Sequence, residues 1–115
     1  PKHRFIEKSK EDFLFFGKEQ FMEWKIEKHQ IRYEEDGKVL AEITFPYYKA
    51  EEKVYEFDHT FVDSSLRGQG IAGTLVEKAI AEVRAQEGKI LPTCPYVKEW
   101  FARHKEEEGI LYREH

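Results

Sequence analysis

The residues best suited to chemistry in this chain form a glycine loop at the start of an amphipathic segment. Arg67-Gly68-Gln69-Gly70 leads directly into Ile71, Ala72 and Gly73, and Thr74 follows with a hydroxyl. The first N–H groups of a helix have no partner inside it, and the helix dipole favours negative charge there. Such a loop therefore binds phosphate groups, and its glycines let the backbone approach them closely. We predict a pyrophosphate site over residues 67–74, with a plain turn as the alternative.

The loop also resembles the Q/R-x-x-G-x-G/A signature of the GCN5-related N-acetyltransferases. The likeness continues, in order, through residues 59–62 (HTFV), 66–73 (LRGQGIAG), 92–97 (PTCPYV) and 100–104 (WFARH). This set is most similar to the minimal single-domain, YjdJ-like group of that superfamily, and it covers about residues 24–104. After His104 the chain departs from the family, because Lys105-Glu106-Glu107-Glu108 stands where members often have Pro-Glu-Tyr.

The resemblance implies acetyl-coenzyme A, or coenzyme A, as co-substrate and no metal. Its pyrophosphate would lie on the glycine loop. Its pantetheine would lie like an inserted strand between two parallel strands that splay apart, residues 54–62 and 89–93, against backbone groups of Phe61 and Val62. Tyr96 would touch the pantetheine or donate a proton.

His59 and Cys94 are the candidate catalytic residues. Taken alone, a histidine on an apolar strand reads as a core residue and a lone cysteine as a small buried hydrophobe. Cys94 precedes Pro95, however, and a helix beginning there would lower the pKa of the thiol. A neutral His59 imidazole could take a proton from an amine or from Cys94. Direct attack by the amine and a transient acetyl-cysteine both stay open.

Periodicity predicts the elements that position these residues. Asp36-Gly37 predicts a hairpin between strands over 26–33 and 38–45. Residues 54–62 alternate, which puts Tyr55, Phe57, His59 and Phe61 on one face of a single strand. A helix over residues 71–83 stopped by Gly88, a short strand over 89–93 and a helix from Pro95 follow. The predicted fold is α+β (α/β): a small mixed sheet with an antiparallel hairpin, then a right-handed parallel strand–helix–strand crossover and a C-terminal helix.

Composition sets the wider bounds. The 115 residues allow one domain, and a net charge of −4 gives no general attraction to nucleic acid or anionic membranes. Residues 31–60 hold eight acids and four bases, which favours a cationic acceptor unless this is simply a solvated face. One cysteine excludes an internal disulfide, and neither a bilayer-spanning run nor a signal-peptide pattern is seen. We therefore expect a cytoplasmic location and, at most, a weak homodimer.

We divide the chain into an N-terminal extension, residues 1–21, and a single acetyltransferase-like domain, residues 22–115. Within the extension Ser9 could cap a helix that carries Phe13, Phe16 and Phe21. The only methionine is Met22, immediately before the first strand. A natural start at Met22 is therefore the second interpretation.

Three functions are consistent with these patterns. The first is an acetyl-coenzyme A-dependent N-acetyltransferase for a small-molecule or peptide amine. The second is a non-catalytic coenzyme A-binding regulatory module, in which His59 and Cys94 would be dispensable. The third is a structural domain whose loop glycines serve only the turn.

Overall fold

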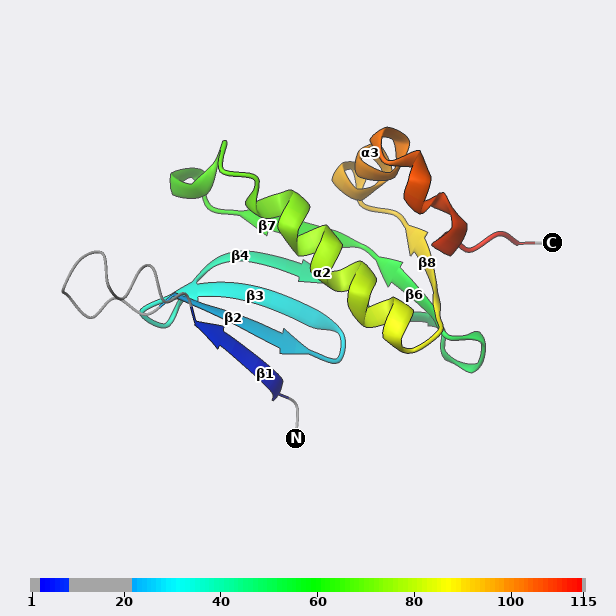
Figure 1. Cartoon of the computed structure of the whole chain (residues 1–115), viewed down its shortest axis with the longest axis horizontal. Helices are drawn as coiled ribbons and strands as arrows, with labels where there is room; N and C mark the ends of the chain where they lie inside the picture. The colour runs from blue at the N-terminus through cyan, green and yellow to red at the C-terminus, as the bar shows by residue number, and fades with distance from the viewer. Residues whose placement is uncertain (1–2, 9–21, 115) are drawn as a thin grey trace.

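The computed structural model describes residues 3–8 and 22–114, which form two β-sheets and two α-helices (Figure 1). The larger sheet is antiparallel, with strand order β1-β2-β3-β4-β7. Its strands are β1 (His3–Lys8), β2 (Met22–Glu27), β3 (Gln30–Glu35), β4 (Lys38–Thr44) and β7 (His59–Val62). The smaller sheet has the order β5-β6-β8, with β5 (Tyr47–Lys49), β6 (Val54–Phe57) and β8 (Lys89–Pro92).

The hairpin predicted at Asp36-Gly37 is confirmed. Both turn residues have positive φ, +50° and +83°, as a two-residue turn of type I′ requires. The strand predicted over residues 26–33 is wrong, because a second tight turn at Lys28 and His29 divides it into β2 and β3. That turn carries neither glycine nor asparagine, so none of its residues indicates a turn.

β1 pairs antiparallel with β2, so part of the predicted N-terminal extension lies in the larger sheet. The helix predicted from Ser9 to Phe21 falls outside the described residues.

The parallel crossover is confirmed: β6 and β8 pair in parallel, and α2 (Ile71–Ala85) lies between them in the chain. The single strand predicted over residues 54–62 is wrong. Asp58 interrupts it, after which β7 leaves the smaller sheet and pairs with β4. The interruption also resets the alternation of side chains, because Tyr55 and Phe57 are buried while His59 and Phe61 are exposed.

The core lies between α2 and one face of the larger sheet (Figure 1). From α2 it takes Leu75, Val76, Ala79, Ile80 and Val83, which pack with Ile31, Ala41 and Ile43 of the sheet. α3 (Pro95–Arg103) begins at its proline, as predicted, and adds Val97, Trp100 and Phe101. Each large apolar side chain fully buried here contributes about 1.5–3 kcal/mol.

Three 3₁₀ helices complete the description: η1 (Ala50–Glu52), η2 (Ser64–Leu66) and η3 (Lys105–Ile110). Neither α-helix in the described part of the chain has the length and apolarity needed to cross a bilayer.

Candidate active site

The glycine loop connects η2 to α2 and is exposed from Arg67 to Gly70. Gly68 and Gly70 both have positive φ, +84° and +75°, which L side chains rarely adopt. The N–H groups of Arg67 and Gln69 donate to Ser64 O and Leu66 O, each at 3.3 Å, and so belong to the turn itself. Within the described residues, no backbone acceptor is found for the N–H groups of Gly68 and Gly70.

The start of α2 supplies further free donors. Its first internal bond runs from Thr74 N–H to Gly70 O (3.1 Å), so the N–H groups of Gly70, Ile71, Ala72 and Gly73 precede any helical partner. With Gly68, five N–H groups gather here, and the space beside Gly68 and Gly70 is open for at least 4 Å. The Thr74 hydroxyl that the prediction includes is not free, because its Oγ1 also donates to Gly70 O (3.1 Å).

Asp63 stabilises the turn that precedes this loop. Its carboxylate accepts bonds from the Ser65 hydroxyl (2.6 Å) and the Ser65 N–H (3.0 Å). These two bonds, aided by the positive charges of Lys38 and Arg67, lower the pKa of Asp63 below its ordinary value. The carboxylate therefore stays ionised and caps η2, the turn that leads into residues 67–70.

The two parallel strands β6 and β8 separate after the pair Phe57 and Pro92. Phe57 O accepts hydrogen bonds from the N–H groups of Thr93 and Cys94, both at 3.1 Å, and Thr60 Oγ1 lies 3.5 Å from Cys94 Sγ. Beyond these contacts β7 pairs with β4, whereas the chain after β8 turns into α3. Thr60 and Cys94 thus mark the vertex of the divergence.

Only alternate residues of β7 have backbone N–H and C=O groups on the edge that faces this divergence. Asp63 N–H donates to Leu40 O (2.7 Å), and the backbone groups of successive residues in an antiparallel strand point to alternate sides. The groups of His59 and Phe61 therefore face β4, while those of Thr60 and Val62 face the open edge. The backbone groups of Val62 are therefore open to a ligand, whereas those of Phe61 pair with β4, and coenzyme A binding at either residue stays a prediction.

Cys94 occupies the N-cap position of α3 and is 8% exposed. Burial raises the pKa of its thiol, but the Thr60 hydroxyl and the N–H groups of Val97, Tyr96 and Thr60 lower it by more. The net pKa lies below that of an ordinary cysteine, although the thiol makes no capping hydrogen bond within α3.

His59 lies on the opposite face of β7 from Cys94. Thr60 faces Cys94, and neighbouring residues of a strand point to opposite faces. The imidazole Nε2 instead lies 3.5 Å from Glu42 Oε2, with its side chain 52% exposed. The structure does not bring the two candidate catalytic residues together, so a direct proton transfer from Cys94 to His59 has no geometric support.

Tyr96 reaches from α3 to the first turn of α2. A methyl group at Gly73 would lie 3.8 Å from both the Tyr96 hydroxyl and Trp100 Nε1, so the two helices approach closely there. Burial raises the pKa of Tyr96; Arg103 opposes this, and Glu99 and Glu77 reinforce it. The phenol therefore lies beside the start of α2, and its contact with pantetheine stays a prediction.

Comparison with known proteins identifies the family. A family model described as GCN5-related N-acetyl-transferase matches residues 21–110. The chain belongs to this acetyltransferase family. None of the curated proteins matches it by sequence.

Two solved structures share its fold. A GCN5-like protein from Staphylococcus aureus, determined by NMR, aligns with a TM-score of 0.64 and 22% identity, covering 80% of this chain and 89% of that one. A crystal structure of an N-acetyltransferase from Staphylococcus aureus Mu50 aligns with a TM-score of 0.52 and 23% identity, covering 72% and 52%. Both support the predicted α+β acetyltransferase-like fold.

The residues around the loop fit the acetyl-coenzyme A that this family implies. Among the described residues, the N–H groups of Gly68 and residues 70–73 have no backbone acceptor, and nothing lies within 4 Å of a methyl group placed at Gly68 or Gly70. Sequence reasoning missed Thr60 and Glu42, the polar partners of the two candidate catalytic residues. Strand alternation points to Thr60 once Asp58 is known to break the strand, but Glu42 becomes visible only through the pairing of β4 with β7.

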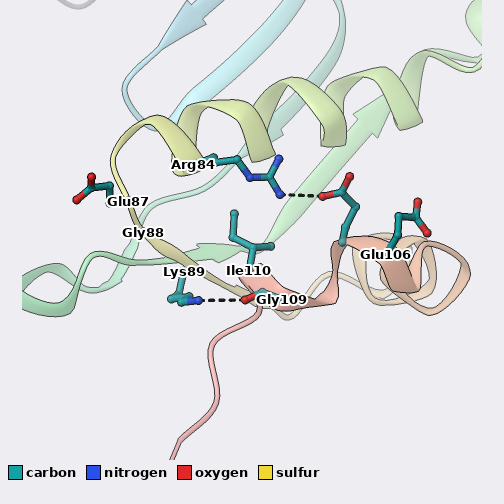
Figure 2. Close-up of a pocket in the computed structure, with 8 residues that line it drawn as sticks. Arg84, Glu87, Gly88, Lys89, Glu106, Gly109 and Ile110 are labelled. Carbon is teal, nitrogen blue, oxygen red and sulfur yellow. Dashed lines mark hydrogen bonds and ion pairs between the residues drawn. The ribbon is translucent and has the colours of Figure 1, made fainter.

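A separate pocket of ≈ 320 Å³ lies at the other end of α2 (Figure 2). Its two cations are already held by the chain: Arg84 donates to Glu107 (2.8 Å) and Lys89 donates to Gly109 O (3.0 Å). It contains none of the predicted site residues. Among the described residues, no group of three His, Cys, Asp or Glu side chains is placed to hold a metal.

Proposed function

We propose that this chain is an N-acetyltransferase that transfers the acetyl group of acetyl-coenzyme A to a small-molecule or peptide amine. Membership of the GCN5-related family supports the reaction class. The observation that carries the proposal is the set of five free N–H groups of Gly68 and residues 70–73, because donors at a helix start suit a pyrophosphate. Arg67, exposed at the loop, adds a positive charge.

When bound, acetyl-coenzyme A supplies an acyl group that passes to the amine as the C–S bond breaks and the C–N bond forms. The Val62 N–H on the open edge of β7 is placed to orient the pantetheine arm. Cys94 and Thr60 line the vertex where the reacting end would lie. His59 accepts the proton that the amine loses. We favour direct transfer over an acetyl-cysteine because His59 and Cys94 lie on opposite faces of β7.

The test is a titration of acetyl-coenzyme A by calorimetry with the wild type and Gly70→Asp, followed by a panel of amines assayed for free thiol. The aspartate adds bulk and negative charge at the helix start, so we expect affinity to fall about tenfold or more. Gly37→Asp is the matched control, because Gly37 also has a positive φ (+83°) and open space around it, in a hairpin turn and not at a helix start.

Equal affinity for the wild type and Gly70→Asp would refute the pyrophosphate site. Binding with no thiol release from any amine would instead select the non-catalytic coenzyme A-binding module. No binding at all would leave the structural domain.

A further inference from the structure

The outer face of β4 and β7, the face away from α2, carries an exposed aromatic side chain beside an acid and an imidazole. Phe61 is 42% exposed, and its Cα partner across the strands is Glu42. Glu42 Oε2 is the atom that lies 3.5 Å from His59 Nε2. Residues opposite one another in a sheet share a face, and so do residues two apart in a strand. We call Glu42, His59 and Phe61 the Phe61 surface.

The inner face of the same strands is closed. Ile31, Ile43 and Thr60 lie opposite one another on that face, where α2 packs. Tyr96 and Trp100 of α3 approach the first turn of α2 at Gly73. Packed core side chains therefore occupy the helix side of these strands. The Phe61 surface lies on the same strand as the vertex and is open to solvent.

The charges around the Phe61 surface favour a cation. Asp58 accepts a hydrogen bond from Thr44 Oγ1 (2.5 Å), and Glu56 accepts one from Thr93 Oγ1 (2.7 Å), next to Cys94 in the chain. Arg32 lies directly opposite Glu42 on β3, and Lys25 lies opposite Arg32 on β2, so both carry positive charge beside this surface. Their charges are matched by ion pairs: Lys25 with Glu34 (3.0 Å), and Arg32 with Glu27 and Glu34 (both 3.3 Å).

We propose that the Phe61 surface is the acceptor site and that it selects amines carrying a second positive charge. This inference rests on the proposed acetyl transfer. The second ammonium group would lie over the Phe61 ring, as cations do on aromatic faces, close to the Glu42 carboxylate. The first amine, deprotonated, would lie beside His59 and reach the vertex across the open edge of β7. A diamine or polyamine has this pair of groups.

The step balances as an acyl transfer. The amine nitrogen forms a bond to the acetyl carbon, the thioester C–S bond breaks, and coenzyme A leaves as a thiolate that takes up a proton from solvent. The proton lost by the amine passes to His59, which returns it to solvent. Glu42 is a positioning residue in this step, because its carboxylate lies 3.5 Å from the imidazole and orients it.

The experiment compares diaminobutane with butylamine, which differ only in the second ammonium group. We expect kcat/KM to be higher for diaminobutane in the wild type. Phe61→Leu should lower kcat/KM for diaminobutane about three- to fivefold. Glu42→Gln should raise the KM for diaminobutane about three- to fivefold and should also lower kcat for both amines. Glu42→Asp keeps the carboxylate, so it should recover part of the change in KM and part of the loss in kcat.

Glu51→Gln is the control, since it removes an exposed glutamate from η1, outside the Phe61 surface. Calorimetry with acetyl-coenzyme A separates this inference from the proposed function, because each variant should bind it as the wild type does. Chemical-shift changes on adding diaminobutane should centre on residues 42 and 59–61. Equal kcat/KM for the two amines, or shifts confined to another surface, would overturn the inference while acetyl transfer stood. Shift changes at the Phe61 surface without turnover would uphold the amine site and refute the enzyme.

Discussion

At the scale of single residues, the Cys94 thiol lies where burial opposes its ionisation and hydrogen-bond donors favour it. Thr60 supplies both a hydroxyl 3.5 Å from the sulfur and a backbone N–H. The helix start supplies the N–H groups of Tyr96 and Val97. The donors outweigh burial, and the pKa falls below the ordinary value.

Thr60→Val should therefore raise the pKa of Cys94, because it removes the hydroxyl and keeps the shape of the side chain. The thiolate fraction at a given pH above neutrality should fall, and the titration midpoint should move to higher pH. Since Cys94 is the only cysteine, the ultraviolet absorbance of the thiolate reports it directly.

The matched control is Thr93→Val, whose hydroxyl donates to Glu56 and belongs to the neighbouring residue in the chain. It should leave the Cys94 titration unchanged. An equal shift in both variants would mean that general burial, not the Thr60 donor, sets the pKa of the thiol.

The residues of the site differ in how far the sequence predicts them. The donors of residues 68–73 follow from local rules: glycines at a helix start free their N–H groups wherever the helix goes. The face on which His59 lies does not follow. Alternation predicts that His59 lies on the same face as Tyr55 and Phe57. The break at Asp58 reverses this face, and the break depends on pairing with β4, which is remote in the sequence.

At the scale of elements, α2 ends before Gly88 as predicted, but Gly88 is required there for a different reason from the one that the sequence suggests. Gly88 N–H donates to Val83 O and Glu87 N–H to Arg84 O, both at 3.0 Å, as in a Schellman motif. The residue with positive φ is Glu87 (+57°), where glycine is usual. Gly88 is required for space: a methyl group there would lie 2.6 Å from Lys53 O.

Gly88→Ala should destabilise the protein by about 1–3 kcal/mol, because the backbone carbonyl of Lys53 has to move away from the added methyl group. Urea unfolding measures the change in the free energy of unfolding. Gly109→Ala is the control, since its methyl group meets nothing within 4 Å and its φ is not positive. A loss as large at Gly109 as at Gly88 would contradict the steric explanation.

Elements whose signals are local were predicted well. The turn at Asp36-Gly37, the length of α2 and the proline at the start of α3 are confirmed. β5 was missed because three residues carry no periodicity, and the turn at Lys28 and His29 because those residues have no turn preference. At that turn His29 is half-buried, with Nδ1 3.0 Å from Phe45 O.

At the scale of the whole molecule, the two ends of α2 belong to two different regions. Its N-terminus forms the glycine loop, and its C-terminus packs near η3 and the last residues described (Figure 1). There Tyr112 N–H donates to Ile90 O (2.8 Å), which attaches the C-terminal segment to β8. The Tyr112 hydroxyl accepts a bond from Lys49 (3.1 Å), and this bond, with the nearby acids, raises the pKa of Lys49.

The fifteen residues of α2 extend for roughly 22 Å, so a change at the C-terminal end should alter stability without altering the loop. Ile110→Ala should lower the free energy of unfolding by about 2–5 kcal/mol, because Ile110 is 7% exposed and belongs to the core. Tyr112→Phe, which removes only the hydroxyl bonded to Lys49, should cost about 1 kcal/mol or less. Calorimetry below the unfolding transition should give the wild-type affinity for acetyl-coenzyme A in both variants. A weakened affinity in Ile110→Ala would mean that the two ends of α2 are coupled, and that the C-terminal segment takes part in organising the loop.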